Sequence, residues 1–441
     1  MIEAEFKKKH NNNTNSNNND ESTTNSNLSK KTSHTATKKL NTSSLNHGIT
    51  EEEKARVQEL FDEMDKNNLW ILEETKRAAA NEVGEALSVE EKILKFALSC
   101  NFRHPSQLFI LDLTDKHWEN VFTQKELQEL EETGDKVLVP VDNAIEEKLN
   151  ELNEFDTAED VYSYSRTIDH NPKEQPWLAW FTMTLMKTAY PFIHNVNIST
   201  YLESDKQYLL WGFLNDIFTG SNIAAQGKEK TSKASATQSN NKRKLSAIDE
   251  VKRKAMGRRM DCIYIGGSKE LGCMEVGSVA DQTKEFKDSG MKMPIVMKDM
   301  LREIVEKAPT LVRRVHMIGY MITGEQVSML DMDSPKGYVS RVRHTVAIDY
   351  PSCSEDYVAR IGPLIELASI VKTKIETTLK IYQTTRIPLE VAKHGSFTLP
   401  PNPFSSSTSS TPTTTTTATP ESSSEDGSLS SHSSKRSKNH Q

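Results

Sequence analysis

Hydrophobic residues follow a helical spacing in the first third of the chain. Between residues 50 and 132, apolar positions recur every three or four residues. Thr50 and Glu53 have the spacing of a capping box, and Ser88 and Thr123 are placed as N-caps. This pattern predicts a mainly α-helical region with helices within 50–68, 88–98 and 123–132.

Two more apolar helices are expected in the middle of the chain, at 177–193 and 204–218. The first contains Lys187 and Pro191 and is shorter than the ~20 residues that a membrane helix needs. It is therefore interpreted as a buried helix. The second has an apolar side at helical spacing, formed by Tyr208, Trp211, Leu214 and Phe218.

From residue 260 the spacing changes to that of β-strands. Strand-like runs occupy 260–265, 272–279, 313–322, 326–333 and 338–348. A helix is expected at 293–308, and a last helix from a capping box at 352–355 to about residue 382. Strands and helices alternate in this order, and a sheet buries its apolar faces against helices. The pattern therefore predicts an α/β domain.

Composition sets the domain boundaries. Hydrophobic residues make up 35% of the 441 residues, below the roughly 45–50% of globular chains when glycine is counted. The polar segments lack the side chains that would offset chain entropy. We expect a disordered tail at 1–48, an acidic helical region at 49–170, an α/β domain at 171–385 with a low-complexity insertion at 220–246, and a second disordered tail at 386–441.

Charge is distributed unevenly. Residues 51–160 hold 29 acidic and 12 basic residues, a net charge of −17, against −7 for the whole chain. The basic half opens with segment 242–259. Such clusters can be nuclear import signals or phosphate contacts, and a solvated linker fits equally well. The candidate residues are Lys242, Arg243, Lys244, Lys252, Arg253, Lys254, Arg258 and Arg259.

The first two strand-like runs each carry one acid, Asp261 and Glu275. Directly opposed residues of an antiparallel pair share a face. An odd hairpin loop, for example residues 267–269, would place the two acids together. An even loop of Gly267 and Ser268 would place them on opposite faces. Alternatively, the acids pair with Arg258, Arg259 or Lys284 and stabilise the hairpin ends without a metal.

The order of these elements, with an acid in each of the first two strands, resembles the PD-(D/E)XK nuclease-like superfamily, and more narrowly a group of proteins expanded in early-diverging fungi. The resemblance covers roughly residues 200–385. It implies a restriction-endonuclease-like sheet in which Asp261 and Glu275 bind Mg²⁺ or Mn²⁺ for phosphodiester hydrolysis. The motif's lysine would fall at Gly277. Similarity to members that supply it from the following helix nominates Lys284 or Lys287.

Several other polar residues have two interpretations. Glu203 or Asp205 would be a third metal ligand or only a favourable acid at a helix start. Arg341 and Arg343 would contact phosphate or form an exposed polar face. His316 and His344 have no second ligand at metal spacing and are interpreted as sheet residues.

Two classes of function remain open from the sequence. The first is a metal-dependent nuclease or its inactive, nucleic-acid-binding descendant. The second is a non-enzymatic and nuclear interaction scaffold whose acidic helical region binds a basic protein partner. The chain shows no secretion signal, and its four cysteines lack C-x-x-C spacing. We therefore expect an intracellular protein with free thiols and no membrane partner.

Overall fold

The structure is a computed structural model of the whole chain, and most of residues 48–404 can be described in it. The described residues are 48–81, 86–240, 254–277, 288–385 and 397–404. Much of the two tails expected from the sequence lies outside these ranges.

The acidic region is mainly α-helical, as its spacing predicts. Thr50, Ser88 and Thr123 each form a capping box, and each hydroxyl accepts a hydrogen bond from the backbone N–H three residues on. Short 3₁₀ turns link some of the helices. The helices are α2 (Glu51–Asp62), α3 (Glu73–Asn81), α4 (Val89–Ser99), α5 (Gln124–Glu132), α6 (Asn143–Leu152) and α7 (Ala158–Ser165).

Helix α8 (Pro176–Ile193) is largely buried, but the helix expected at 204–218 is broken. It divides into α9 (Glu203–Asp205), a π-helical turn (Lys206–Leu210) and α10 (Phe213–Asp216). A π turn takes up an extra residue and so rotates the side chains that follow it. As a result Tyr208 is 55% exposed while Trp211 is buried, so the apolar side drawn from the sequence was wrong at Tyr208. Among the described helices, none has the length and apolar character to span a membrane.

Residues 223–240, expected to be part of a low-complexity insertion, form ordered structure instead. They contain β2 (Ile223–Gln226), β3 (Lys230–Thr231) and α11 (Lys233–Asn240). The buried carboxylate of Glu270 accepts hydrogen bonds from the Lys233 N–H at 2.7 Å and the Ser232 hydroxyl at 2.7 Å. A distant acid therefore caps this polar helix, which composition alone does not reveal.

One mixed sheet organises the chain, in the order β1-β9-β8-β7-β6-β5-β2, with β10 paired to β8. Two neighbouring pairs are parallel, β1 with β9 and β6 with β7. The short β3 and β4 form a separate pair. The remaining strands are β1 (Ile110–Asp112), β4 (Arg259–Met260), β5 (Cys262–Gly266), β6 (Lys269–Gly277), β7 (Met317–Thr323), β8 (Gln326–Asp333), β9 (Ser340–His344) and β10 (Ile348–Asp349).

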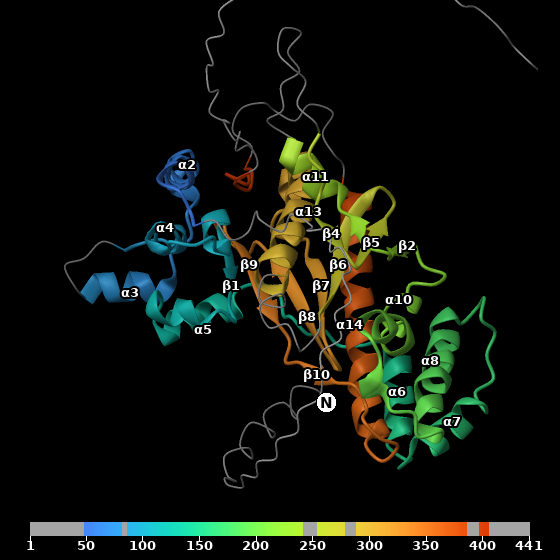
Figure 1. Cartoon of the computed structure of the whole chain (residues 1–441). Coiled ribbons are helices and arrows are strands. Elements are labelled where there is room, and N and C mark those ends of the chain that lie inside the picture. The colour runs from blue at the N-terminus through green and yellow to red at the C-terminus, as the bar shows by residue number, and fades with distance from the viewer. Residues whose placement is uncertain (1–47, 82–85, 241–253, 278–287, 386–396, 405–441) are drawn as a thin grey trace, which may run out of the picture. The chain divides into compact units, whose positions relative to one another are not determined.

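Helices α13 (Met293–Lys307) and α14 (Tyr357–Thr384) cover opposite faces of the sheet (Figure 1). Two glycines lie where the helices approach the sheet closely. A Cβ at Gly319 would meet side chains of α13, and a Cβ at Gly272 would meet a side chain of α14. The α/β class predicted from the sequence is confirmed. Helix α14 begins five residues after the expected cap at Ser352, whose N–H and hydroxyl instead bond to Asp356.

The described residues form two hydrophobic clusters. The larger one lies between the sheet and helices α8, α13 and α14, and the smaller one lies among the first helices. Tyr338 and Val339, from the loop before β9, belong to the smaller cluster. Residues 397–404, expected to belong to a disordered tail, pack against both clusters, because Leu399 and the aromatic rings beside it are apolar.

Candidate functional site

The register of the β5–β6 hairpin determines whether Asp261 and Glu275 lie on the same face of the sheet. Gly266 pairs with Lys269, so the turn has two residues, the even loop that would separate the acids. A β-bulge follows, in which Leu271 is the extra residue, and beyond it Cys262 pairs with Met274. Extended by one residue, this register places Asp261 beside Glu275. The bulge thus reverses the effect of the even turn.

The carboxylate of Asp261 is fixed at the end of the β5 ladder. Its Oδ2 accepts a hydrogen bond from the Val276 N–H at 2.7 Å. The side chain therefore satisfies a β6 N–H where the backbone pairing with β5 stops. Asp261 remains partly exposed, so its carboxylate lies between the strand and solvent.

Glu275 is 7% exposed and forms an ion pair with Lys292. Lys292 is the last residue of a π turn (Asp288–Lys292) that leads into α13. Its side chain is 25% exposed. The lysine nearest Glu275 among the described residues thus comes from the start of the following helix. Lys284 and Lys287, nominated from the sequence, lie outside the described residues.

Lys292 was not expected from the sequence as part of the site. The only signal for it is its place two residues before Pro294, which marks the first turn of α13. The spacing of 17 residues from Glu275 is set by the segment between β6 and α13 and follows no short motif.

The basic segment is only partly described. Residues 242–244, together with Lys252 and Arg253, lie outside the described ranges, and Lys254 is exposed. Arg258 approaches Asp299 at 3.8 Å and donates to the Ser235 hydroxyl at 3.3 Å.

Arg259 is 61% exposed in its side chain and pairs with Glu229 at 3.1 Å. Arg258 therefore helps to hold α11 against α13, whereas Arg259 stands at the surface two residues from Asp261.

The third-ligand candidates Glu203 and Asp205 lie on the short helix α9. The next residue, Lys206, forms an ion pair with Glu325 in the turn between β7 and β8. Because β6 and β7 are parallel, with Gly277 paired to Thr323, this turn lies at the same sheet end as Glu275. Helix α9 therefore lies near the sheet end that carries the candidate site.

Arg341 and Arg343 are buried, which corrects the expectation of an exposed polar face. Arg341 is 0% exposed and binds Asp333 with two nitrogens, and Arg343 lies 3.4 Å from the same carboxylate. Arg341 also donates to the backbone carbonyl of Leu130. The two arginines link the end of α5 to the sheet, and because they are buried they cannot contact a phosphate group.

Both sheet histidines pair with carboxylates. His316 Nδ1 lies 2.7 Å from Asp331, and His344 Nε2 lies 3.1 Å from Asp112. Burial opposes the charged form of His316, yet the neighbouring Asp331 raises the pKa of its imidazole. Their interpretation as structural residues of the sheet is consistent with these contacts.

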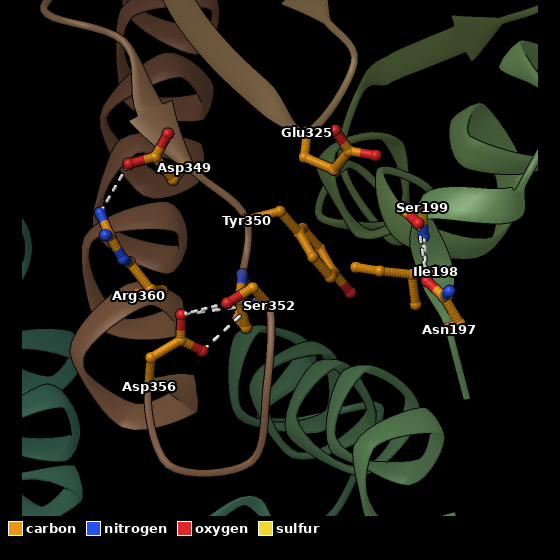
Figure 2. A pocket seen from close by; sticks show the side chains of 10 residues that line it. Asn197, Ile198, Ser199, Glu325, Asp349, Tyr350, Ser352, Asp356 and Arg360 are labelled. Carbon is orange, nitrogen blue, oxygen red and sulfur yellow. Dashed lines mark hydrogen bonds and ion pairs between the residues drawn. The ribbon is translucent and has the colours of Figure 1, made fainter. Parts of the chain in front are cut away.

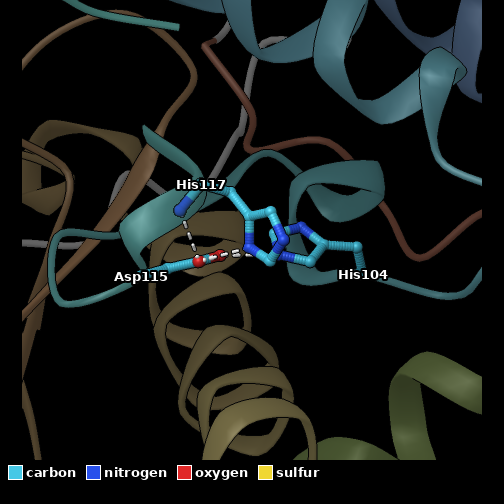
Figure 3. Close-up of side chains that lie close together, drawn as sticks. All are labelled: His104, Asp115 and His117. Carbon is cyan, nitrogen blue, oxygen red and sulfur yellow. Dashed lines mark hydrogen bonds and ion pairs between the residues drawn. The ribbon is translucent and has the colours of Figure 1, made fainter. Parts of the chain in front are cut away.

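A second polar group, not expected from the sequence, contains His104, Asp115 and His117 (Figure 3). The carboxylate of Asp115 contacts both rings, with one oxygen 2.7 Å from His104 Nε2 and the other 2.7 Å from His117 Nδ1. Burial opposes ionisation, but the hydrogen bonds from the two histidines lower the pKa of Asp115 to about 2. Two imidazoles and a carboxylate are a donor set that suits Zn²⁺ or another transition metal.

The hydrogen bonds of His104 argue against a resident metal. The backbone N–H of Ser106 donates to His104 Nδ1 at 3.1 Å, so Nδ1 is the acceptor nitrogen. Nε2 then carries the proton and donates it to Asp115, which leaves no lone pair for a metal. Ser106, His104 and Asp115 also have the connectivity of a hydrolase triad, but Ser106 is 0% exposed. We therefore assign this group a structural role.

A cavity of about 360 Å³ opens beside the turn between β7 and β8 (Figure 2). Its charged lining groups are already paired: Asp349 binds Arg360 at 2.7 Å, and Asp356 accepts from Ser352. Glu325, at its edge, binds Lys206. The cavity lies at the sheet end that carries Glu275, but it has no convergent group that points to a reaction.

The chain was also compared with known proteins. The comparisons found no matching protein family, no matching curated protein and no matching solved structure.

Proposed function

We propose that this chain is a nuclease-like protein that cleaves nucleic-acid phosphodiesters with Mg²⁺ or Mn²⁺. One observation carries the proposal: Asp261, Glu275 and Lys292 gather at the carboxyl end of β6. Two carboxylates and one lysine at a strand end are the groups that the PD-(D/E)XK resemblance requires. Lys292 takes the place of the lysine absent at Gly277.

The sheet order supports the same proposal. Strands β2, β5 and β6 are antiparallel neighbours, helix α13 follows β6, and β7 returns parallel to β6. We infer that this unit is the nuclease-like core and that β8, β9, β10 and β1 extend it. The site then lies at the sheet end where β6 and β7 both terminate.

The donor set fits a hard divalent cation. Asp261 and Glu275 offer only oxygen atoms, which Mg²⁺ and Mn²⁺ prefer over nitrogen or sulfur. A bound cation would neutralise charge on the scissile phosphate and activate water. The Val276 N–H orients Asp261, and Lys292 holds Glu275 by an ion pair while its ammonium group can donate to a phosphate oxygen.

Exposed cations next to the site provide contacts to the substrate backbone. A Cβ at Gly227 would stand 3.6 Å from the carbonyl oxygen of Asp261, so the loop that carries Lys228 borders the site. Lys228 and Arg259 are both exposed. Their charges suit phosphate binding without sequence preference.

The test is cleavage of labelled single- and double-stranded DNA and RNA by the full-length protein, with Mg²⁺, Mn²⁺ or a chelator. Asp261→Asn, Glu275→Gln and Lys292→Met keep the side-chain size, and each should lower the rate on the order of 100-fold or more, because each removes a charge at the reacting phosphate. Lys307→Met is the matched control, since Lys307 is exposed at the other end of α13. It should cleave like the wild type.

Two results would overturn the catalytic proposal. One is the lack of metal-dependent cleavage on all four substrates, and the other is cleavage that persists in all three site variants. Salt-dependent binding without cleavage would reduce the proposal to an inactive nucleic-acid-binding descendant. If neither cleavage nor binding occurs, the scaffold alternative remains.

We also propose that the basic clusters at 242–244 and 252–254 direct the protein to the nucleus. A fluorescent fusion of the full chain should accumulate in nuclei and lose this distribution when the six basic residues become alanine. An unchanged distribution would reject the import signal and leave phosphate contact as the role of the segment.

A further inference from the structure

Residues 397–404, FTLPPNPF, pack against both the larger and the smaller hydrophobic cluster. Leu399 is 1% exposed within the larger cluster. Phe397 and Phe404 are partly buried and pack against both clusters. Residues far apart in the sequence contact the segment, which therefore lies on a surface built by the folded chain.

The first phenylalanine lies between an aromatic ring and a guanidinium group. The Phe397 ring stacks on Tyr338 with centroids 4.6 Å apart and planes at 16°. The Arg313 guanidinium lies 4.6 Å from the centre of the Phe397 ring. Arg313 is itself fixed, because it donates to the backbone carbonyls of Ser334 and Gly337 at 2.8 and 2.7 Å. This half of the surface is preorganised by contacts that do not involve the segment.

The second phenylalanine has a similar support. The Arg103 guanidinium lies 4.7 Å from the centre of the Phe404 ring. Glu53 holds Arg103 by an ion pair of 2.5 Å, and Glu53 is fixed in turn by its capping box with Thr50. Each end of the segment therefore has a cation–π contact, Arg313 with Phe397 and Arg103 with Phe404. The distance between the two arginines sets the spacing of the phenylalanines that can bind.

The residues between the phenylalanines suit recognition by packing. Pro400, Pro401 and Pro403 have no N–H to satisfy and restrict the backbone, so the segment loses little entropy when it docks. Pro400 and Pro403 are buried. Proline-rich peptides bind other proteins on aromatic-lined grooves in this way.

We propose that Arg103, Arg313 and Tyr338 form a peptide-binding surface for proline-rich segments with a phenylalanine at each end. Residues 397–404 occupy this surface in cis, and a partner protein with a segment of the same chemistry competes for it. A tethered segment has a high effective concentration, so the surface is largely closed to a partner until the segment is released. The proposal is independent of the nuclease activity proposed above.

Fluorescence anisotropy of a labelled FTLPPNPF peptide with the full-length protein tests the proposal. The double variant Phe397→Ala, Phe404→Ala releases the segment and should bind the peptide ~10- to 100-fold more tightly than the wild type. Adding Tyr338→Ala to the double variant should abolish this gain. A peptide with both phenylalanines replaced by alanine should not bind.

Phe102→Ala is the matched control, because Phe102 is a 50% exposed phenylalanine next to Arg103 that lies outside the segment. It should bind the peptide as weakly as the wild type. Phe404→Ala alone keeps Phe397 and Leu399 in place and should give an intermediate gain, which provides a test if the double variant does not fold.

A folded double variant that binds no more tightly than the wild type would overturn the proposal. If the double variant does not fold, the absence of any gain in Phe404→Ala would overturn it. Binding that survives Tyr338→Ala would also overturn it, because the peptide would then occupy another surface. Circular dichroism and thermal unfolding establish that each variant is folded.

Discussion

Lys298 provides a test of how charge is buried in this fold. It lies on α13, is 4% exposed, and donates from its Nζ to the backbone carbonyl of Leu108. Burial, with a smaller contribution from Arg302, lowers the pKa of Lys298 to about 7, while Asp299 acts in the opposite direction. In the folded protein Lys298 therefore loses its proton near neutral pH.

The free-energy consequence follows from proton linkage. The pKa falls from 10.5 in the unfolded chain to about 7 in the folded protein. The unfolded state therefore binds more protons between these values, and stability from this group is lost as the pH falls from 10.5 to 7. At about 1.4 kcal/mol for each pKa unit, the cost at pH 7 is about 4 kcal/mol.

We expect Lys298→Met to remove this cost. Methionine matches the shape of the lysine stem without its charge, and it leaves the Leu108 carbonyl without its donor, at a cost of about 1–3 kcal/mol. The variant should therefore be more stable than the wild type by about 1–3 kcal/mol at pH 7. By pH 10 the wild type should have gained about 3–4 kcal/mol relative to the variant.

Urea unfolding of both proteins at pH 7, 8, 9 and 10 measures this difference. Groups that do not interact with Lys298 titrate alike in both proteins, so their contributions cancel in the comparison. A difference in unfolding free energy that stays constant within about 1 kcal/mol from pH 7 to 10 would refute the reasoning. Lys298 would then keep an ordinary pKa in the folded protein.

Three further predictions concern stability. Arg341→Met should lower the unfolding free energy by about 3–5 kcal/mol in urea titration, because it leaves Asp333 buried without its bidentate partner; a loss below 1 kcal/mol would contradict this. Glu270→Ala should increase amide hydrogen exchange in α11 first, since Glu270 caps that helix; uniform exchange across the fold would count against the cap. Asp115→Asn should remove stability that the wild type has above pH 4 and loses as the pH falls towards 2, because the pKa of Asp115 is lowered to about 2; equal acid unfolding of both proteins would contradict that prediction.

Local signals predicted the helices well where neighbours in sequence form the structure. The capping boxes at Thr50, Ser88 and Thr123 close within three residues, so the sequence contains all their partners. The expected cap at Ser352 failed because Asp356, four residues on, accepts from the Ser352 N–H and from its hydroxyl, which in a capping box would itself be the acceptor. A motif of this kind is reliable only when no competing acid lies nearby.

Strand pairing depended on contacts that no local pattern records. β1 joins the sheet beside β9, more than 200 residues later. A two-residue turn at Gly267 and Ser268 would by itself separate the two acids, and the sequence left the loop length open; only the bulge at Leu271 places Asp261 beside Glu275. A bulge depends on how a strand fits its neighbours, so the printed sequence does not fix its position.

Local sequence patterns were enough to predict the α/β class, the helical acidic region and the two acids of the candidate site. These follow from hydrophobic spacing, helix caps and residue chemistry, all of which act over a few neighbouring residues. Packing of the whole chain was needed to place Lys292 beside Glu275, to bury Arg341 against Asp333, and to bring residues 397–404 against both clusters. Such contacts join residues from 8 to several hundred positions apart, and chain packing as a whole decides them.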